Sequence, residues 1–543
     1  MYEAFLETVR NKPDSACICV PAAPGRDYLP DGVEWSYGEV EASVARLMEL
    51  YRRAGYGHGH VVALMMANRP EFMLHWFAHN ALGICTVPIN PDYRAPEITF
   101  ILKRSGTDLL VSLPEYLDVT TQAASSAELP HPVPVVSSAN FDGSFDKPRK
   151  AMETAPPGRD TLSGILFTSG TSGLPKACML TNEYMFFAGE RYNATGGLMT
   201  IQDGQERLYN PLPLFYSNSF GISNAAMILT GNCMIFPDRF HPKSWWKELA
   251  QTRATMIHYL GIIPPVLLSL PHDPAEREHQ VRFGVGAGTT PLQRRQFHER
   301  FGLRLVEVWG MTEVGICIIE HKDAEVLDDV RTIGWPLHET EVRVANVNND
   351  NDEEAPRGEV GELLIRRAGP DPRKGLFGGY LGDEETMKTV WRNDWFHTGD
   401  LVRWNDDGRL VFVDRLKDMI RRSGQNIAAA EVEVGLFGLE GIGEVAVIAA
   451  PDELRDEEVM ACIVPAAGYE PNSDLAHKIF AGAVDRLAYF KLPGWIAFVD
   501  ELPRTSTEKL RKSELSKKID ELRSSGKCFD LRGLKKPAKK SAA

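Results

Sequence analysis

The chain has 543 residues, of which 43% are hydrophobic and 25% are charged, and its formal net charge at pH 7 is −14. This composition excludes a mainly disordered protein, and the acidic balance argues against nucleic acid as the main partner. One hydrophobic core rarely supports a chain of this length, so two or more domains are expected.

The chain gives no sign of secretion or membrane insertion. Its first ten residues carry acids where a secretion signal has basic residues, and no apolar run approaches the length of a membrane span. Eight cysteines are scattered, and the one close pair, Cys17 and Cys19, alternates with apolar residues as in a strand. We therefore expect a cytoplasmic protein with buried, reduced thiols rather than a cysteine metal site.

Residues 1–160 alternate helical and strand-like segments. The apolar spacing predicts a helix from Tyr37 to Ala54, and Val61 to Met65 reads as a buried strand before a helix entry at Pro70. Such alternation favours a layered α/β domain. Residues 115–159 are rich in Ser, Ala and Pro and are expected to form mostly loops.

A small-residue loop follows the apolar run at residues 165–167. Its backbone N–H groups, hydroxyls and terminal lysine suit a polyphosphate, although a Gly/Ser surface turn is the alternative. The spacing is not that of a Walker A loop, where glycine and lysine are adjacent. The loop comprises Thr168, Ser169, Gly170, Thr171, Ser172, Gly173, Leu174, Pro175 and Lys176.

This loop resembles the phosphate loop of the adenylate-forming superfamily, which includes acyl-CoA synthetases, luciferases and peptide-synthetase adenylation domains. The resemblance implies that Tyr216, Ser217 and Asn218 line an acyl pocket beside the ATP site. Tyr216 stands where the family usually has histidine, so imidazole chemistry is absent at that position. The alternative is an aromatic ring packed under a Pro-rich loop.

Residues 283–308 are predicted to form a strand, a helix and a second strand. The first strand ends in Gly286, Ala287 and Gly288, and the helix should start near Pro291 and end at Gly302. Both strands then deliver their carboxyl ends to one sheet edge, where ligands bind in open α/β folds. We assign these three residues at the end of the first strand to the ATP site.

The stretch 309–313 resembles the family's aromatic-Gly-x-Thr-Glu motif. By that resemblance Trp309 stacks on adenine, Thr312 hydrogen-bonds the α-phosphate and Glu313 holds Mg²⁺. Gly310 and Met311 are assigned to the ATP site, and Gly310 also to the acyl pocket. Taken alone, Glu313 would more often be a surface acid.

Two further motifs precede the expected domain boundary. Asp400 resembles the family's aspartate that accepts both ribose hydroxyls, and Arg415 the arginine that contacts ribose and phosphate. His397 lacks a recognisable catalytic partner and is taken as structural. Lys417 occupies the family's hinge position, and the resemblance places Ser423 and Gly424 on the coenzyme A side.

The last part resembles the family's small lid domain, with strands at 445–449 and 459–464 and a helix over about 474–489. By the resemblance, Lys509 bridges the carboxylate substrate and the α-phosphate during adenylation. Glu508 replaces the usual glycine before it. If that glycine needs a positive φ, Glu508 is strained, and its charge weakens the field of Lys509.

The motifs occur in family order over nearly the whole chain. We expect an α/β fold with a large multi-subdomain portion, 1–416, made of layered sheets and a small β-barrel-like part. A mobile α+β lid, 417–526, and a flexible basic tail, 527–543, follow. The implied activity is an ATP-dependent carboxylate:CoA ligase that uses ATP, Mg²⁺ and coenzyme A.

Three alternatives stay open at this stage: an enzyme that loads a carrier protein, a luciferase-type oxygenase, and a nucleotide sensor that has lost catalysis. The expected partners are small molecules, with no nucleic acid and no integral membrane association. A homodimer is compatible with the sequence, which does not identify the carboxylic acid.

Overall fold

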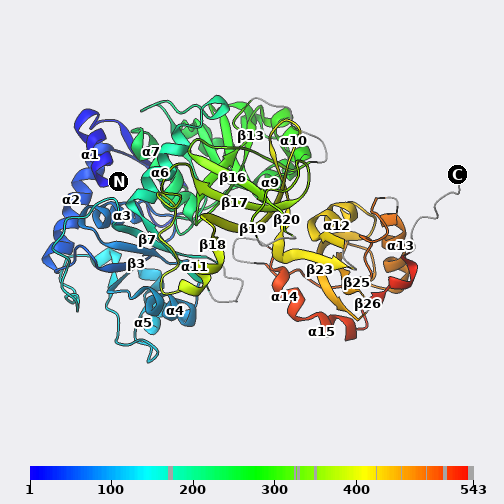
Figure 1. Ribbon diagram of the computed structural model, residues 1–543. Coiled ribbons are helices and arrows are strands. Elements are labelled where there is room, and N and C mark those ends of the chain that lie inside the picture. The colour runs from blue at the N-terminus through cyan, green and yellow to red at the C-terminus, as the bar shows by residue number, and fades with distance from the viewer. Residues whose placement is uncertain are drawn as a thin grey trace. The chain divides into compact units, whose positions relative to one another are not determined.

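The computed structural model describes residues 1–168, 175–322, 326, 330–347, 351–422, 425–453, 455–484, 486–504 and 510–535. They fall into two compact units (Figure 1). The first comprises Met1–Val342 and Ile365–His397, and the second Arg343–Leu364 and Thr398–Ala543. The α/β class with a smaller C-terminal unit agrees with the sequence prediction.

One sheet of the first unit carries the start of the predicted phosphate loop. Its strands are parallel except for the last pair, which is antiparallel. The fully buried β3 carries no polar side chain, as expected for a parallel strand covered on both faces. In spatial order the strands are β6 (Val135–Ser137), β5 (Leu109–Ser112), β3 (Val61–Met65), β4 (Cys85–Pro88), β7 (Leu162–Thr168) and β8 (Lys176–Thr181).

A second sheet carries the glycine-ended strand and the aromatic motif. It is parallel from β1 to β13 and antiparallel at both margins. From β2 to β15 the strands in order are β2 (Val33–Ser36), β1 (Ala16–Val20), β10 (Cys233–Ile235), β9 (Arg207–Tyr209), β11 (Met256–Leu260), β12 (Phe283–Ala287), β13 (Arg304–Met311), β14 (Gly315–Ile319) and β15 (Thr332–Pro336), and the sheet order continues from β15.

The helices of the first unit follow the predicted apolar patterns. A Ser36 capping box starts the helix predicted at 37–54, and Gly302, at φ +70°, ends the helix that starts at Pro291. The helices are α1 (Tyr2–Asn11), α2 (Tyr37–Arg53), α3 (Pro70–Leu82), α4 (Ala95–Ser105), α5 (Leu117–Ala124), α6 (Asn182–Asn193), α7 (Asn224–Leu229), α8 (Trp245–Gln251), α9 (Ile263–Ser269), α10 (Pro291–Phe301) and α11 (Glu384–Val390).

The cysteines agree with the expectation of reduced thiols. All eight cysteines, each within the described ranges, are free thiols, and Cys17 and Cys19 lie buried on β1. Within these ranges, no helix combines the length and the apolar character that crossing a bilayer requires.

Three strands pass from one unit to the other along the chain: β16 (Thr340–Ala345), β17 (Gly361–Arg367) and β19 (Trp395–Trp404). β16 and β17 are neighbours in the sheet order. Two further strands, β18 (Trp391–Arg392) and β20 (Leu410–Arg415), both pair with β19. The domain boundary at 416/417 and a hinge at Lys417 stay predictions.

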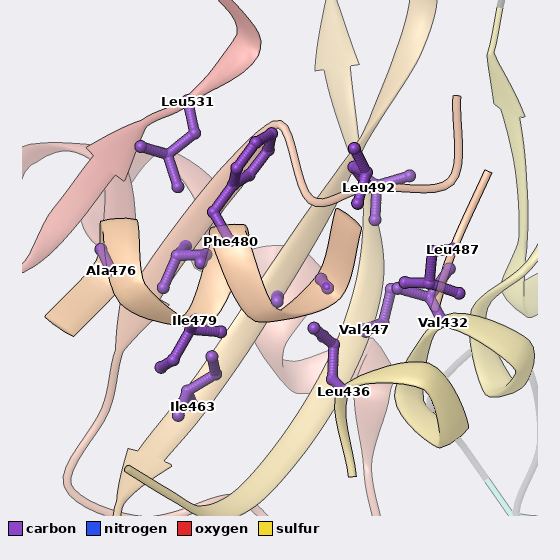
Figure 2. Packing of buried hydrophobic residues seen from close by; sticks show 14 of the residues in the cluster. Val432, Leu436, Val447, Ile463, Ala476, Ile479, Phe480, Leu487, Leu492 and Leu531 are labelled. Atoms are coloured by element: carbon purple, nitrogen blue, oxygen red, sulfur yellow. The ribbon is translucent and has the colours of Figure 1, made fainter. Parts of the chain in front are cut away.

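The second unit packs helices on a sheet of its own. Side chains of α12 and α13 gather over β23 and β24 (Figure 2). Its sheet contains β22 (Gln425–Ala428), β21 (Met419–Arg422), β24 (Asp456–Pro465), β25 (Trp495–Phe498) and β26 (Cys528–Asp530), with β23 (Ile442–Asp452) beside β24. Its helices are α12 (Ala429–Leu436), α13 (Ser473–Val484), α14 (Lys512–Lys517) and α15 (Ile519–Ser524).

Two segments of this unit differ from the sequence expectations. The helix expected to reach residue 489 ends at Val484, although Leu487 still packs in the same core and therefore prolongs the apolar pattern. Residues 527–535, expected to begin a flexible tail, instead form β26 beside β25 and a short 3₁₀ turn ending at Leu534. Lys535 is buried, so the ordered chain extends beyond the expected end of the lid.

Candidate active site

The stem of the phosphate loop is an antiparallel hairpin. Thr168, at the end of β7, lies opposite Lys176, at the start of β8. The Lys176 ammonium lies 4.9 Å from the centroid of the Tyr380 ring, a distance at which a cation and an aromatic face attract each other. The loop is therefore entered from a buried strand, as predicted, and its lysine has an aromatic neighbour that the sequence analysis missed.

The glycine-ended strand β12 lies between β11 and β13, parallel to both. A Cβ on Gly286 would lie 2.3 Å from the carbonyl oxygen of Tyr259, so only glycine fits there. The following loop is held by the buried carboxylate of Glu307, which accepts hydrogen bonds from the Gly288 N–H at 2.7 Å and the Thr289 hydroxyl at 2.6 Å. Burial raises the pKa of Glu307.

The aromatic motif spans the end of β13 and the turn before β14. Trp309 is buried, and the Thr312 hydroxyl donates to the Ser217 hydroxyl at 3.2 Å. This hydrogen bond joins Thr312, predicted to contact the α-phosphate, to Ser217 of the predicted acyl pocket. Glu313 is 5% exposed, and its Oε1 accepts a hydrogen bond from the Tyr380 hydroxyl at 2.7 Å. Burial, followed by the charge of Glu313, raises the pKa of Tyr380.

Asn218 of the predicted acyl pocket is fixed by a histidine that sequence reasoning missed. His258, on β11, places Nδ1 2.8 Å from Asn218 Oδ1 and Nε2 2.8 Å from the Tyr192 hydroxyl. Burial lowers the pKa of His258 to about 3, and a neutral ring protonated on Nδ1 satisfies both partners. Asn218 also starts a short π-helix, Asn218–Ser223, directly after Tyr216 and Ser217.

In the second unit, the structure brings together two residues that were assigned from separate motifs. Asp400, on β19, lies opposite Arg415, on β20, and the Arg415 Nε is 2.9 Å from Asp400 Oδ1. Asp400 is 3% exposed. The Thr398 hydroxyl accepts from the Asp400 N–H and donates to the Leu363 carbonyl, so the turn that carries the aspartate is firmly held.

Comparison with known proteins places the chain in a family. The profile of the AMP-binding enzyme family matches residues 5–381, and that of the AMP-binding enzyme C-terminal domain matches residues 431–509. A feruloyl-CoA synthase from Amycolatopsis is 30% identical over 490 residues, which cover 90% of this chain and 94% of that protein. This chain is an AMP-binding enzyme.

Other relatives agree. A crotonobetaine/carnitine–CoA ligase from Citrobacter koseri is 28% identical, with 89% of this chain and 93% of that protein covered. The fold matches ATP-bound MatB from Rhodopseudomonas palustris, with a TM-score of 0.80, 23% identity and coverage of 96% and 99%. It also matches Bacillus subtilis o-succinylbenzoate CoA synthetase with its acyl-adenylate, with a TM-score of 0.79, 21% identity and coverage of 94% and 97%. The resemblance to the adenylate-forming superfamily is thus confirmed.

The donor set of this AMP-binding enzyme suits the magnesium ion that the sequence resemblance implies. Among the described residues, no group of three or more His, Cys, Asp or Glu side chains could enclose a metal ion. Mg²⁺ commonly binds through one or two carboxylates together with substrate phosphates and water. Glu313 offers one buried carboxylate for such binding. Its hydrogen-bond partner Tyr380 lies next to the Lys176 side chain, which is predicted to contact phosphate.

The structure describes some of the remaining candidate residues of the AMP-binding enzyme and leaves others outside the described ranges. For Lys417 the backbone is described, in the 3₁₀ turn Leu416–Asp418. His397, taken as structural, is hydrogen-bonded through Nδ1 to the Arg392 guanidinium at 2.9 Å. The predicted residues outside the described ranges are Ser169, Gly170, Thr171, Ser172, Gly173, Ser423, Gly424 and Lys509.

Proposed function

We propose that this enzyme is an ATP-dependent carboxylate:CoA ligase, which forms an acyl-adenylate and then an acyl-CoA thioester. The observation that carries the proposal is the buried Glu313 carboxylate, which follows Thr312 in the chain and is hydrogen-bonded to Tyr380, the residue whose ring lies next to the Lys176 ammonium. Relatives named as CoA synthase and CoA ligase over 89–90% of the chain support the same reaction.

In the first half-reaction, a carboxylate oxygen attacks the α-phosphorus of ATP and pyrophosphate leaves. Both reactants are negatively charged, so the enzyme has to neutralise and align them. We assign Lys176 and the hydroxyls of the loop to the leaving phosphates, and Thr312 and Lys509 to the α-phosphate. When bound at Glu313, Mg²⁺ would supply positive charge to the phosphate oxygens.

Asp400 and Arg415 are assigned to the nucleoside. A carboxylate accepts hydrogen bonds from both ribose hydroxyls, and the Arg415 guanidinium that now contacts Asp400 keeps further donors for a phosphate. Trp309 offers its face to adenine. Tyr216, Ser217, Asn218 and Gly310 are assigned to the acyl group.

In the second half-reaction, the thiol of coenzyme A attacks the adenylate carbonyl and AMP leaves. A lysine on the α-phosphate side would obstruct the incoming thiol, so Lys509 has to withdraw between the two steps. We assign this motion to a lid that follows Lys417, with Ser423 and Gly424 on the coenzyme A side.

Replacing Lys417 by proline is expected to slow thioester formation at least about tenfold more than adenylation, since proline restricts the backbone dihedral angles that a hinge must change. Pyrophosphate release and acyl-CoA formation from supplied acyl-adenylate would be measured separately. Lys417→Ala, which keeps backbone freedom, serves as the control. Equal slowing of both steps by the proline variant would contradict a hinge at this position.

A carboxylate panel tests the proposed function most directly. Pyrophosphate release would be measured with ferulate, crotonobetaine and a long-chain fatty acid, each with and without coenzyme A. Carboxylate-dependent release excludes a nucleotide sensor, and consumption of the adenylate by coenzyme A rather than by a phosphopantetheinyl carrier excludes a carrier-loading enzyme. No release with any carboxylate would overturn the proposal. A cytoplasmic location and a homodimer stay predictions.

A further inference from the structure

Tyr380 lies between two groups that the proposed function uses for different parts of MgATP. Its hydroxyl donates to Glu313 Oε1 at 2.7 Å, and the centroid of its ring lies 4.9 Å from the Lys176 ammonium. Glu313 and Tyr380 are 67 residues apart in the chain. One side chain therefore contacts both the predicted magnesium carboxylate and the predicted phosphate lysine.

The backbone around Tyr380 is fastened to the strand that begins at Lys176. The segment 378–381 adds to β8 through hydrogen bonds from Gly378 N–H to Met179 O at 2.7 Å and from Met179 N–H to Gly379 O at 2.9 Å. A third bond runs from Leu381 N–H to Ala177 O at 2.9 Å. Backbone pairing fixes the Cα of Tyr380, and the Tyr380 ring lies next to Lys176.

The same segment also fastens the residue that carries the carboxylate. The Phe377 N–H donates to the backbone oxygen of Glu313 at 2.9 Å, while the Tyr380 hydroxyl holds its side chain. Cys178 Sγ lies 3.7 Å from the same Oε1. Glu313 is thus held through main chain and side chain, and its carboxylate oxygens keep lone pairs for a metal after accepting hydrogen bonds from the Tyr380 hydroxyl and the Cys178 thiol.

We propose that Tyr380 is a positioning residue for the magnesium ion, whose hydroxyl orients the Glu313 carboxylate relative to Lys176. The inference rests on the proposed magnesium role of Glu313. Hydrogen-bonding partners of metal ligands commonly decide metal affinity, because they fix the ligand before the ion arrives. The affinity for magnesium should therefore depend on the Tyr380 hydroxyl more than the affinity for metal-free ATP does.

The test is calorimetric titration of the full-length enzyme with ATP, in excess Mg²⁺ and in excess EDTA, without a carboxylate so that no turnover occurs. The magnesium-dependent gain in ATP affinity is expected to fall about tenfold in Tyr380→Phe. Its affinity for metal-free ATP is expected to stay within about twofold, because phenylalanine keeps the aromatic face next to Lys176.

Tyr184→Phe is the matched control. It removes a hydroxyl that is also buried but has no hydrogen-bond partner among the described residues, so the magnesium-dependent gain should not change. Glu313→Gln should remove most of the gain, and adding Tyr380→Phe to it should change the remainder by less than about twofold, because the two residues act through one interaction.

If Tyr380→Phe keeps the wild-type gain in ATP affinity with Mg²⁺, the inference is overturned. It is also overturned if the variant loses as much affinity for metal-free ATP as for MgATP, because that result indicates a packing role alone. If Tyr380→Phe does not fold, Tyr380→His, which keeps a donor, is expected to retain the gain, and its loss would contradict the inference. The wild-type enzyme could bind MgATP and yet release no pyrophosphate with any carboxylate. That result would contradict the ligase function, but the binding test of Tyr380 would still be valid.

Discussion

Replacing Lys509 by alanine is expected to slow carboxylate-dependent pyrophosphate release by about 100- to 1000-fold, the usual cost of losing one group aimed at developing charge. The carboxylate and the α-phosphate repel each other, and the ammonium is assigned to the space between them. Thioester formation from supplied acyl-adenylate should change no more than about threefold, since Lys509 has withdrawn by that step.

Both half-reactions would be followed in the same preparation, pyrophosphate release by a coupled assay and acyl-CoA by chromatography. Lys517→Ala is the matched control, because Lys517 is an exposed lysine of the same unit and carries no assigned role. Parallel loss of both half-reactions in Lys509→Ala would contradict the two-conformation account. An unchanged rate of pyrophosphate release would remove Lys509 from the adenylation step.

The placement of the candidate residues that lie on neighbouring strands could be predicted from the sequence. The parallel strands β12 and β13 bring the glycine loop and the aromatic motif to one sheet edge, as the strand–helix–strand pattern indicated. Asp400 and Arg415 come from neighbouring strands whose pairing places them opposite each other. In these cases the local pattern determines the geometry, because sheet register follows from the alternation of buried side chains.

The supporting residues could not be predicted, because their partners are distant in the chain. Tyr380 reaches Glu313 across 67 residues, His258 reaches Asn218 across 40, and Glu307 reaches back to Gly288 across 19. Weak signals did exist. Glu307 interrupts an apolar strand and His258 lies in a buried one, positions where a polar side chain needs a specific partner.

The end of the chain shows how composition can mislead. A run rich in lysine predicts a solvated tail, yet Lys535 is buried beside Glu458, whose side chain is fully buried. The Arg422 Nε donates to both Glu458 oxygens at 2.9 Å, and the Lys535 ammonium donates to Oε1. Burial lowers the pKa of Lys535 to about 8, against the opposing effect of Glu458. One buried acid therefore anchors the last described residue.

Replacing Glu458 by alanine is expected to lower the local stability of the second unit by about 3–5 kcal/mol, because Arg422 and Lys535 stay buried without their counter-charge. A chain with two units has no single unfolding free energy, so hydrogen exchange of β24 and β25 in the full-length enzyme is the measurement. Amides of β7, in the first unit, should keep their protection.

Two variants separate charge from packing in this cluster. Glu470→Ala removes an exposed acid of the same unit and should change local stability by no more than about 0.5 kcal/mol. Combining Glu458→Leu with Arg422→Met and Lys535→Met should recover most of the loss, since apolar side chains of similar volume replace a buried ionic group at little cost. If the triple variant is as unstable as Glu458→Ala, lost packing rather than unpaired charge governs this region, and the anchoring role of Glu458 has to be abandoned.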